Sequence, residues 1–221
     1  MSHSNSPLTA RQPSLALAAC LLAAALAGCG SGTAAAGGAG PAAPAPASKT
    51  SHSAAAGGQA PVPAQSNPPG DIPDTTVYVT YQATGGHLKV KVPEGWSRAS
   101  TSAGATFTSN LNSIKLTWMP MTGPPTVSSA RSTTVPALRA GALAFRLQAV
   151  RSVSLPGGPA VEVIYQVNSA PNPVTGRQYR LVIERFVFYR NGHGAVLSLS
   201  SAVGSDNVDP WRIVSESFRW A

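Results

Sequence analysis

Every aromatic residue of this chain lies at Tyr78 or later, and this distribution restricts what the first third of the chain can fold into. Residues 1–72 contain none of the 14 Phe, Trp and Tyr residues and consist mostly of Ala, Gly, Pro and Ser. A segment with so few large apolar side chains cannot build a packed core. We therefore expect the folded part to be residues 73–221, a length that suits one domain and excludes a large multidomain enzyme.

The N-terminal segment has the pattern of an export signal. Its polar start contains one arginine, Arg11, and an apolar run of 13 residues follows from Leu15 to Ala27. A helix needs about 20 apolar residues to cross the bilayer core, whereas the shorter run is typical of a signal peptide. We therefore predict that residues 1–28 are a signal peptide.

The residues that end this apolar run predict a lipid attachment site at Cys29. The sequence LAGC at 26–29 matches the bacterial lipobox, in which the cysteine thiol receives a diacylglycerol. The alternative is a chance cysteine in an Ala- and Leu-rich signal. The other cysteine, Cys20, would leave with the signal peptide, so the domain would contain neither a disulfide nor a reactive thiol. The expected location is the extracytoplasmic face of the cell membrane.

Residues 29–72 have the composition of a linker. They alternate between Pro-rich and Gly/Ser-rich pieces, and Lys49 is their only Lys or Arg. Such sequences form flexible chains with locally extended segments. We predict a disordered tether that holds the domain away from the membrane. Without the lipid, the same residues would be an untethered tail.

Alternation of apolar and polar residues predicts a sheet in the domain. The clearest strands are 87–92, 113–118, 161–167 and, as the longest, 178–190. Period-two alternation is typical of half-buried strands. Two-residue turn signals occur at Gly85-Gly86, Pro156-Gly157 and Asn191-Gly192. Connections this short imply antiparallel hairpins.

Two segments are predicted as helices. The first, 126–142, is rich in Ala, Ser and Arg, and Pro136 must interrupt or restart it. The second begins at Asp209-Pro210, an N-cap residue followed by a proline at the first helical position, with an alternative start near Ser205. Strands, a helix, four strands and a helix in this order predict an α+β fold. We expect an antiparallel β-sheet packed with helices on its faces.

The domain resembles the PsbP-like family. The resemblance is carried by the strand, turn and tryptophan of LKVKVPEGW at 88–96, and by Ser217-Phe218 after a short C-terminal helix. It spans nearly all of residues 76–220 and implies an antiparallel sheet between helices, as on extracytoplasmic lipoproteins of actinobacteria. These motifs are packing signatures. The resemblance therefore implies a fold and a compartment, and no active site.

The domain contains few residues that suit catalysis or metal binding. His87 lies on a strand and His193 in a turn, without the spacing or the neighbouring Cys and His residues of a metal site. The seven acidic residues include no evident acid–base pair, and the sequence lacks a nucleophile elbow and a phosphate-binding loop. We therefore predict no enzyme, no catalytic residues, no metal and no cofactor. An enzyme would need a cleft in which His87 or His193 meets a carboxylate.

Positive charge is the remaining global feature. Residues 73–221 contain 14 Lys and Arg against 7 acidic residues, which favours an anionic envelope component or an acidic protein partner. We expect no nucleic-acid partner for an exported lipoprotein, and the alternative is a basic surface that serves solubility alone. In the alternation of strand 178–190, Arg185 falls on the same face as the apolar residues. We therefore expect it at a sheet edge or in an ion pair. The other basic residues on or beside the predicted strands are Lys89, Lys91, Lys115, Arg177, Arg180 and Arg190.

Two functional hypotheses follow from these features. The first is a non-enzymatic, membrane-anchored binding or assembly module of the cell envelope, which predicts a filled core and a salt-sensitive interaction through the basic surface. The alternative is a small-molecule or lipid carrier, which predicts an apolar cavity on the order of several hundred Å³ between sheet and helices. For each aromatic candidate for that lining, packing in the core is the alternative and favoured role. These candidates are Trp118, Tyr165, Phe186, Phe188 and Trp211.

Overall fold

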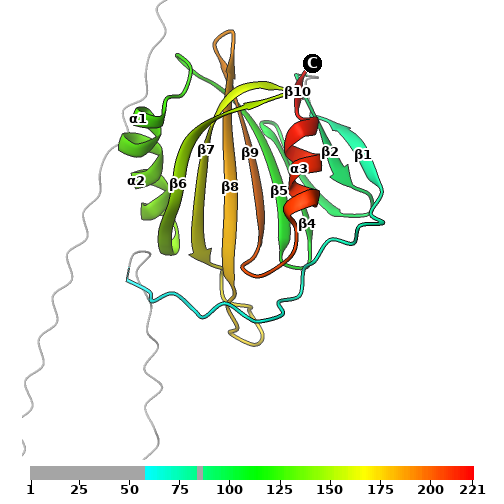
Figure 1. Ribbon diagram of the computed structural model, residues 1–221, viewed down its shortest axis with the longest axis vertical. Helices are drawn as coiled ribbons and strands as arrows, with labels where there is room; N and C mark the ends of the chain where they lie inside the picture. The colour runs from blue at the N-terminus through cyan, green and yellow to red at the C-terminus, as the bar shows by residue number, and fades with distance from the viewer. Residues whose placement is uncertain (1–57, 84–86) are drawn as a thin grey trace, which may run out of the picture. The chain divides into compact units, whose positions relative to one another are not determined.

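A computed structural model describes residues 58–83 and 87–221, which form an α+β domain of antiparallel sheets and helices (Figure 1). The predicted fold class is confirmed. The strands are β1 (Tyr78–Gln82), β2 (Leu88–Pro93), β3 (Ser97–Thr101), β4 (Gly104–Ser109), β5 (Asn112–Pro120), β6 (Leu143–Leu155), β7 (Gly158–Asn168), β8 (Arg180–Arg190), β9 (His193–Ala202) and β10 (Arg219–Trp220). The helical elements are α1 (Val127–Ser129), the π-helical turn η1 (Ala130–Thr134), α2 (Val135–Ala140) and α3 (Val208–Ser217).

Several predictions concern residues outside these ranges. The predicted signal peptide, the lipid attachment site Cys29 and residues 29–57 of the predicted tether all precede the described residues. Within the described ranges, no helix combines the length and apolar character needed to cross a membrane.

Seven strands form the main sheet in the order β3-β4-β5-β9-β8-β7-β6, and neighbouring strands run antiparallel. The predicted hairpin at Asn191-Gly192 is confirmed, since both residues have positive φ, 49° and 80°, as a type I′ turn between β8 and β9 requires. The hairpin at Pro156-Gly157 likewise joins β6 to β7. The expectation for the longest strand is wrong. Strand β6 has 13 residues and β8 has 11, because β6 continues along β7 through two register shifts.

A smaller sheet of β1, β2 and β10 packs with α3 over one face of the main sheet. Strands β1 and β2 pair antiparallel, as predicted, although the Gly85-Gly86 turn lies outside the described residues. The fully buried Leu88 and Val90 of β2 meet Val214 of α3 in the core. Phe218 directly after α3 stacks on Phe188 of β8 at a ring-centroid distance of 4.2 Å. This core fixes the main sheet against its C-terminal helix.

Helix α3 begins two residues earlier than predicted. Asn207, and not Asp209, occupies the N-cap position, and its side chain makes no capping hydrogen bond. The Asn207 amide instead accepts from the Ile72 backbone N–H at 2.8 Å and donates to the Gly70 carbonyl at 3.0 Å. A buried amide side chain that pairs with backbone groups ties distant segments together.

Residues 58–72, which the sequence assigns to the tether, run along the domain. Ile72 is 5% exposed and belongs to the main core. Asn168 at the end of β7 accepts from the Val62 backbone N–H and donates to the Ala60 carbonyl. Buried asparagines of the domain therefore hold a segment that has few apolar residues of its own. Contacts of the domain extend to residues before the expected boundary at 73.

The segment Val127–Ala140 is helical throughout, and Pro136 interrupts its regular α-helical form. A proline lacks the N–H that would bond to the carbonyl four residues earlier, and the chain widens into the π-helical turn η1 before α2 begins. The buried Val135 packs with Val163 of β7 and Ile183 of β8 in a second core. This core holds α1, η1 and α2 on the sheet.

Alternate residues of β7 and β8 pack in the two different cores. Phe186 and Phe188 belong to the core beneath α3, whereas Val163 and Ile183 belong to the core beneath α1 and α2. Successive side chains of a strand point to opposite faces, so helices cover both faces of the sheet, as predicted. In Figure 1, α3 lies in front of the sheet and α1 and α2 lie beside β6.

Candidate functional site

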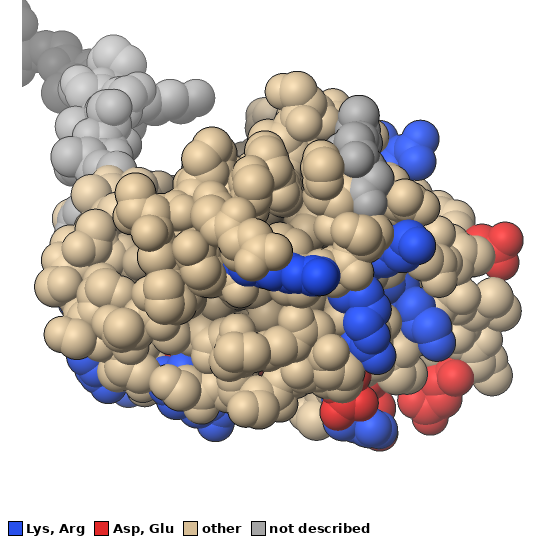
Figure 2. Space-filling view, turned by 90° about the horizontal axis from the view of Figure 1, so that it is seen from above, with Lys and Arg blue, Asp and Glu red and all other residues tan. Residues whose placement is uncertain are grey.

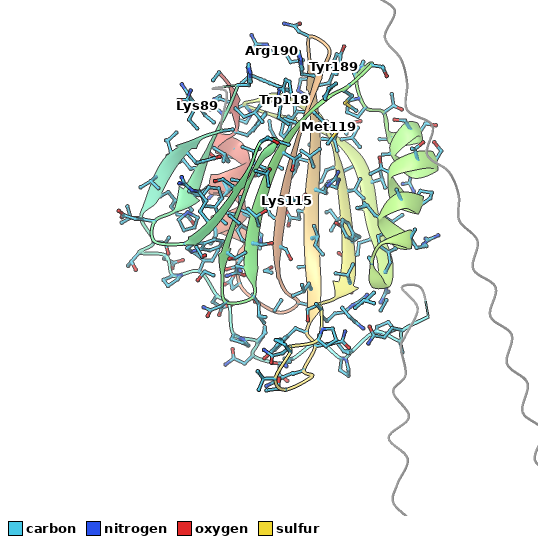
Figure 3. All side chains as sticks on the ribbon, turned by 180° about the vertical axis from the view of Figure 1, so that it is seen from behind. Lys89, Lys115, Trp118, Met119, Tyr189 and Arg190 are labelled. Atoms are coloured by element: carbon cyan, nitrogen blue, oxygen red, sulfur yellow. The ribbon has the colours of Figure 1, made fainter. Side chains whose placement is uncertain are left out.

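A groove with a volume of about 590 Å³ lies between α2 and the main sheet. One side is formed by α2 and the turn that follows it, and the floor by β7, β8, β9 and β5. This volume falls within the range of small-molecule sites. Figure 3 shows the molecule from this side. Lys115 of β5 is labelled, and strands of the main sheet separate it from α1 and α2, at the right of the view.

The groove exists because α2 is short. The helix has six residues and ends at Ala140, and the chain turns at Gly141 into β6. The helix contacts β6, and among the described residues the groove continues from it to β9 and β5. Leu138, Val167 and Leu181 are only partly buried on the helix side of the groove, so apolar surface remains accessible there.

The opposite half of the groove is polar, and its residues lie in rows across the strands. Arg185 of β8 is opposite Ser198 of β9, which is opposite Lys115 of β5. The next row toward the loop after β7 contains Ser200 and Ser113. Because paired residues share a face and neighbouring strands are about 4.8 Å apart, both cations and all three hydroxyls line one floor.

Arg185 is the unusual member of this floor. Its Nη1 donates to Ser198 Oγ at a long 3.4 Å, and its Nε is buried without a hydrogen-bond partner among the described residues. Burial lowers the pKa of Arg185. The expectation of an edge position or an ion pair is wrong, because β8 lies between β7 and β9 and the groove supplies no acidic neighbour from the residues described.

The basic residues of β2 form a separate cluster from the groove. Lys89 and Lys91 of β2 lie with Arg219 around a shallow pocket of about 450 Å³, which Glu216 also lines. In the face shown in Figure 2, Lys and Arg side chains occur in several groups, with acidic side chains next to some of them. The positive charge of the described residues is therefore divided among several places.

Three further basic residues lie at or near the ends of β8. Arg180 is 5% exposed and donates to the Ala144 carbonyl at 2.7 Å and to Asn168 Oδ1 at 3.1 Å. Arg177 lies over the Tyr179 ring at 4.9 Å, and Arg190 is exposed at the other end of β8. These contacts give Arg180 a structural role that the sequence does not reveal.

The two histidines both pack on Trp118, although they come from distant segments. His87 and His193 stack on Trp118 at ring-centroid distances of 5.3 and 4.6 Å. They line a pocket of about 360 Å³ together with Arg190 and Trp220. The ion pairs within the described part of the chain are Arg151–Glu162 and Arg212–Asp209, and neither involves a histidine.

Two carboxylates lie on the opposite face of the sheet from the groove. Glu162 is 2% exposed and pairs with Arg151. Burial, and then the charge of Glu162, raise the pKa of Glu184 on the adjacent strand, and Arg151 opposes this shift. Neither carboxylate lines the groove.

Of the five aromatic candidates for the cavity lining, one lines the groove, and core packing, the other role that the sequence suggests, accounts for three more. Tyr165 lines the groove, and burial raises the pKa of its hydroxyl. Phe186, Phe188 and Trp211 fill the core beneath α3, and Trp118 stacks with His87 and His193. The groove is lined mainly by aliphatic and small polar side chains.

The predicted lipid attachment residue, Cys29, lies outside the described residues. Within residues 58–83 and 87–221, no three His, Cys, Asp or Glu side chains form a group that could hold a metal ion. One pattern in the sequence marks the floor of the groove. In β9, Ser198 and Ser200 place hydroxyls on the face that carries Arg185, where an apolar face would be expected.

Comparisons with known proteins concern the fold. No protein-family model and no curated protein matches the sequence. The solved structures that are similar include the cyanobacterial PsbP of Synechocystis sp. PCC 6803, with 17% identity, a TM-score of 0.45, and coverage of 70% of this chain and 100% of that one. A PsbP protein is thus among the similar structures, as the resemblance in the sequence implies.

Two further structures have comparable similarity. The Ran-binding protein Mog1p of Saccharomyces cerevisiae has 8% identity and a TM-score of 0.46, with 66% of this chain and 96% of that one covered. LpqN of Mycobacterium tuberculosis, described as involved in cell envelope biogenesis, has 11% identity and a TM-score of 0.45, with 67% and 92% covered. Similarity at this level carries no conclusion about function.

Proposed function

We propose that this chain is a lipid-anchored, extracytoplasmic binding protein without enzymatic activity, and that it holds a small molecule or lipid in the groove beside α2. The observation that supports this proposal is the groove itself, which combines a volume of about 590 Å³ with accessible leucine and valine side chains. Small-molecule sites typically join an apolar wall to a few polar groups.

The groove favours the carrier hypothesis over a module that acts only through a basic surface. Such a module predicts a filled core and a salt-sensitive interaction through the basic surface. The described residues add an open groove to their packed cores, and their cations are divided among several places. The anchor at Cys29 and the envelope location remain predictions from the signal sequence, and an anionic partner at the surface likewise stays a prediction.

Blocking the groove tests the proposal. Ala137 and Ala140 are both exposed on α2, but only Ala137 lines the groove. We expect Ala137→Trp to abolish binding of the neutral fluorescent probe N-phenyl-naphthylamine, because the indole would fill the site, and Ala140→Trp to leave binding unchanged. Titrations of the full chain carrying Cys29→Ser would measure both affinities without an attached lipid. Equal binding by the two variants would contradict the assignment of the groove.

A further inference from the structure

We infer that the ligand of the groove is an anionic, single-chain amphiphile, whose head group binds Arg185 and Lys115 and whose tail lies along α2. This inference rests on the proposed function and adds the chemical class of the ligand. The head-group chemistry is a carboxylate, as in a free fatty acid, or a phosphate, as in a lysophospholipid.

The unsatisfied hydrogen-bonding capacity of Arg185 indicates an anion. A guanidinium keeps its charge in proteins and carries five N–H donors. In Arg185, Nε is buried without a partner among the described residues, and the one hydrogen bond, from Nη1 to Ser198 Oγ, is long at 3.4 Å. Arg185 as a whole is half-buried, and a charge drawn out of water is normally paired. A carboxylate or phosphate is the group that a guanidinium binds best, often through two parallel hydrogen bonds.

The surroundings of Arg185 add further attraction for an anion. Lys115 lies two strands away in the same row, so the two Cα atoms are about 10 Å apart, and both long side chains can reach a head group between them. Ser198 lies between them and Ser200 in the next row, and both offer hydroxyl donors. Of the described residues that line the groove, none is acidic. A positive site without a protein counter-ion selects a negatively charged ligand.

The helix side of the groove suits an acyl chain. Leu138, Val167 and Leu181 are partly buried there, and Ile183 separates them from Arg185 along β8. This order places apolar contacts at one end of the groove and charge at the other. A neutral apolar ligand would leave Arg185 unpaired, and an inorganic anion would leave the leucines exposed. An amphiphile satisfies both ends.

Displacement of N-phenyl-naphthylamine from the full chain with Cys29→Ser tests the inference. The competitors share one tail and differ in the head: dodecanoate, dodecyl phosphate and neutral dodecanol, each below its micellar concentration. We expect both anions to displace the probe at lower concentration than dodecanol does. The tighter anion identifies the source of the head group, and either order supports the inference.

Variants then locate the head group. Arg185→Met should weaken binding of the anions by about 10- to 100-fold, the loss expected for a hydrogen-bonded charge pair, and should leave dodecanol affinity unchanged. Lys115→Met should weaken the anions less, because Lys115 is exposed. Lys89→Met removes a cation from β2, outside the groove, and should change neither affinity. Arg185→Gln provides the same measurement if the methionine variant folds poorly.

Three results would overturn the inference. They are equal affinity for dodecanol and the anions, unchanged anion affinity in both Arg185 variants, and an equal loss in Lys89→Met, which would place the anions on the protein surface. Failure of the proposed function has a different signature. In that case Ala137→Trp would bind the probe as the parent does, and no competitor would act through the groove.

Discussion

Replacing Arg185 by methionine should stabilise the unliganded protein, although the change removes a charged side chain that donates a hydrogen bond. The reason is that the groove buries the Arg185 Nε without a partner among the described residues. Methionine has a similar length, contains no donor and can pack against the neighbouring apolar side chains. Ligand binding and stability would therefore respond to this substitution in opposite directions.

The size of the effect follows from two opposing contributions. Removing a buried unsatisfied N–H relieves about 1–3 kcal/mol. Losing the bond to Ser198 costs about 0.5–1.5 kcal/mol at most, because that bond is long at 3.4 Å. The net increase in the free energy of unfolding is about 1 kcal/mol. With a urea dependence of about 2 kcal/mol per molar, the midpoint should rise by about 0.5 M.

Urea unfolding followed by tryptophan fluorescence measures this change, and Arg180→Met is the matched control on the same strand. Arg180 donates at 2.7 Å to the Ala144 carbonyl and at 3.1 Å to Asn168 Oδ1, although its Nη2 also lacks a partner among the described residues. Its replacement should destabilise the protein by about 2–4 kcal/mol, because buried acceptors lose their donor. A lower midpoint in Arg185→Met would refute the reasoning.

Three further predictions concern other parts of the chain. Gly157→Ala should lower stability by about 1–3 kcal/mol, because the new Cβ would lie 2.4 Å from Phe218 Cδ1, and an unchanged urea midpoint would count against this contact. Burial raises the folded-state pKa of Glu184, so the stability that the protonated group contributes is lost as the pH rises from about 4 through the folded pKa. The urea midpoint of Glu184→Gln should therefore rise relative to that of the parent as the pH increases. A difference between the two midpoints that does not change with pH would contradict this prediction. Cys29→Ser should move the protein out of the membrane fraction on cell fractionation, and retention there would exclude the lipid anchor.

Much of the fold could be predicted because its signals are local. Turn residues at Asn191-Gly192 and Pro156-Gly157 specify hairpins by their backbone preferences. Pro136 interrupts a helix because it lacks an N–H. Each of these effects acts within a few residues, so a single segment of sequence contains the whole cause.

The groove could not be predicted in the same way, because it depends on how far α2 extends over the sheet. The alternation of residues placed Arg185 on the apolar face of its strand, but that face continues past the end of α2, where Ser198 and Lys115 line the groove. The sequence therefore indicated an anomaly at Arg185 without indicating an open site. Whether the site is open depends on packing between segments that are far apart in the sequence.

Long-range contacts also explain the other unpredicted features. His87 and His193 meet at Trp118 because β2, β5 and β9 converge there from distant parts of the chain. The hydrogen bonds of Asn207 to Gly70 and Ile72 span more than a hundred residues of sequence. Neither contact leaves a periodic pattern.

The most direct measurement of the central proposal is a crystal structure of the full chain, with Cys29→Ser, grown with dodecyl phosphate. A ligand of the inferred class should lie in the groove, with its tail against Leu138 and Leu181 and a phosphate oxygen within about 3 Å of Arg185 Nε. An empty groove in that crystal, with the phosphate held instead at Lys89 and Lys91, would contradict both the site and the role of Arg185.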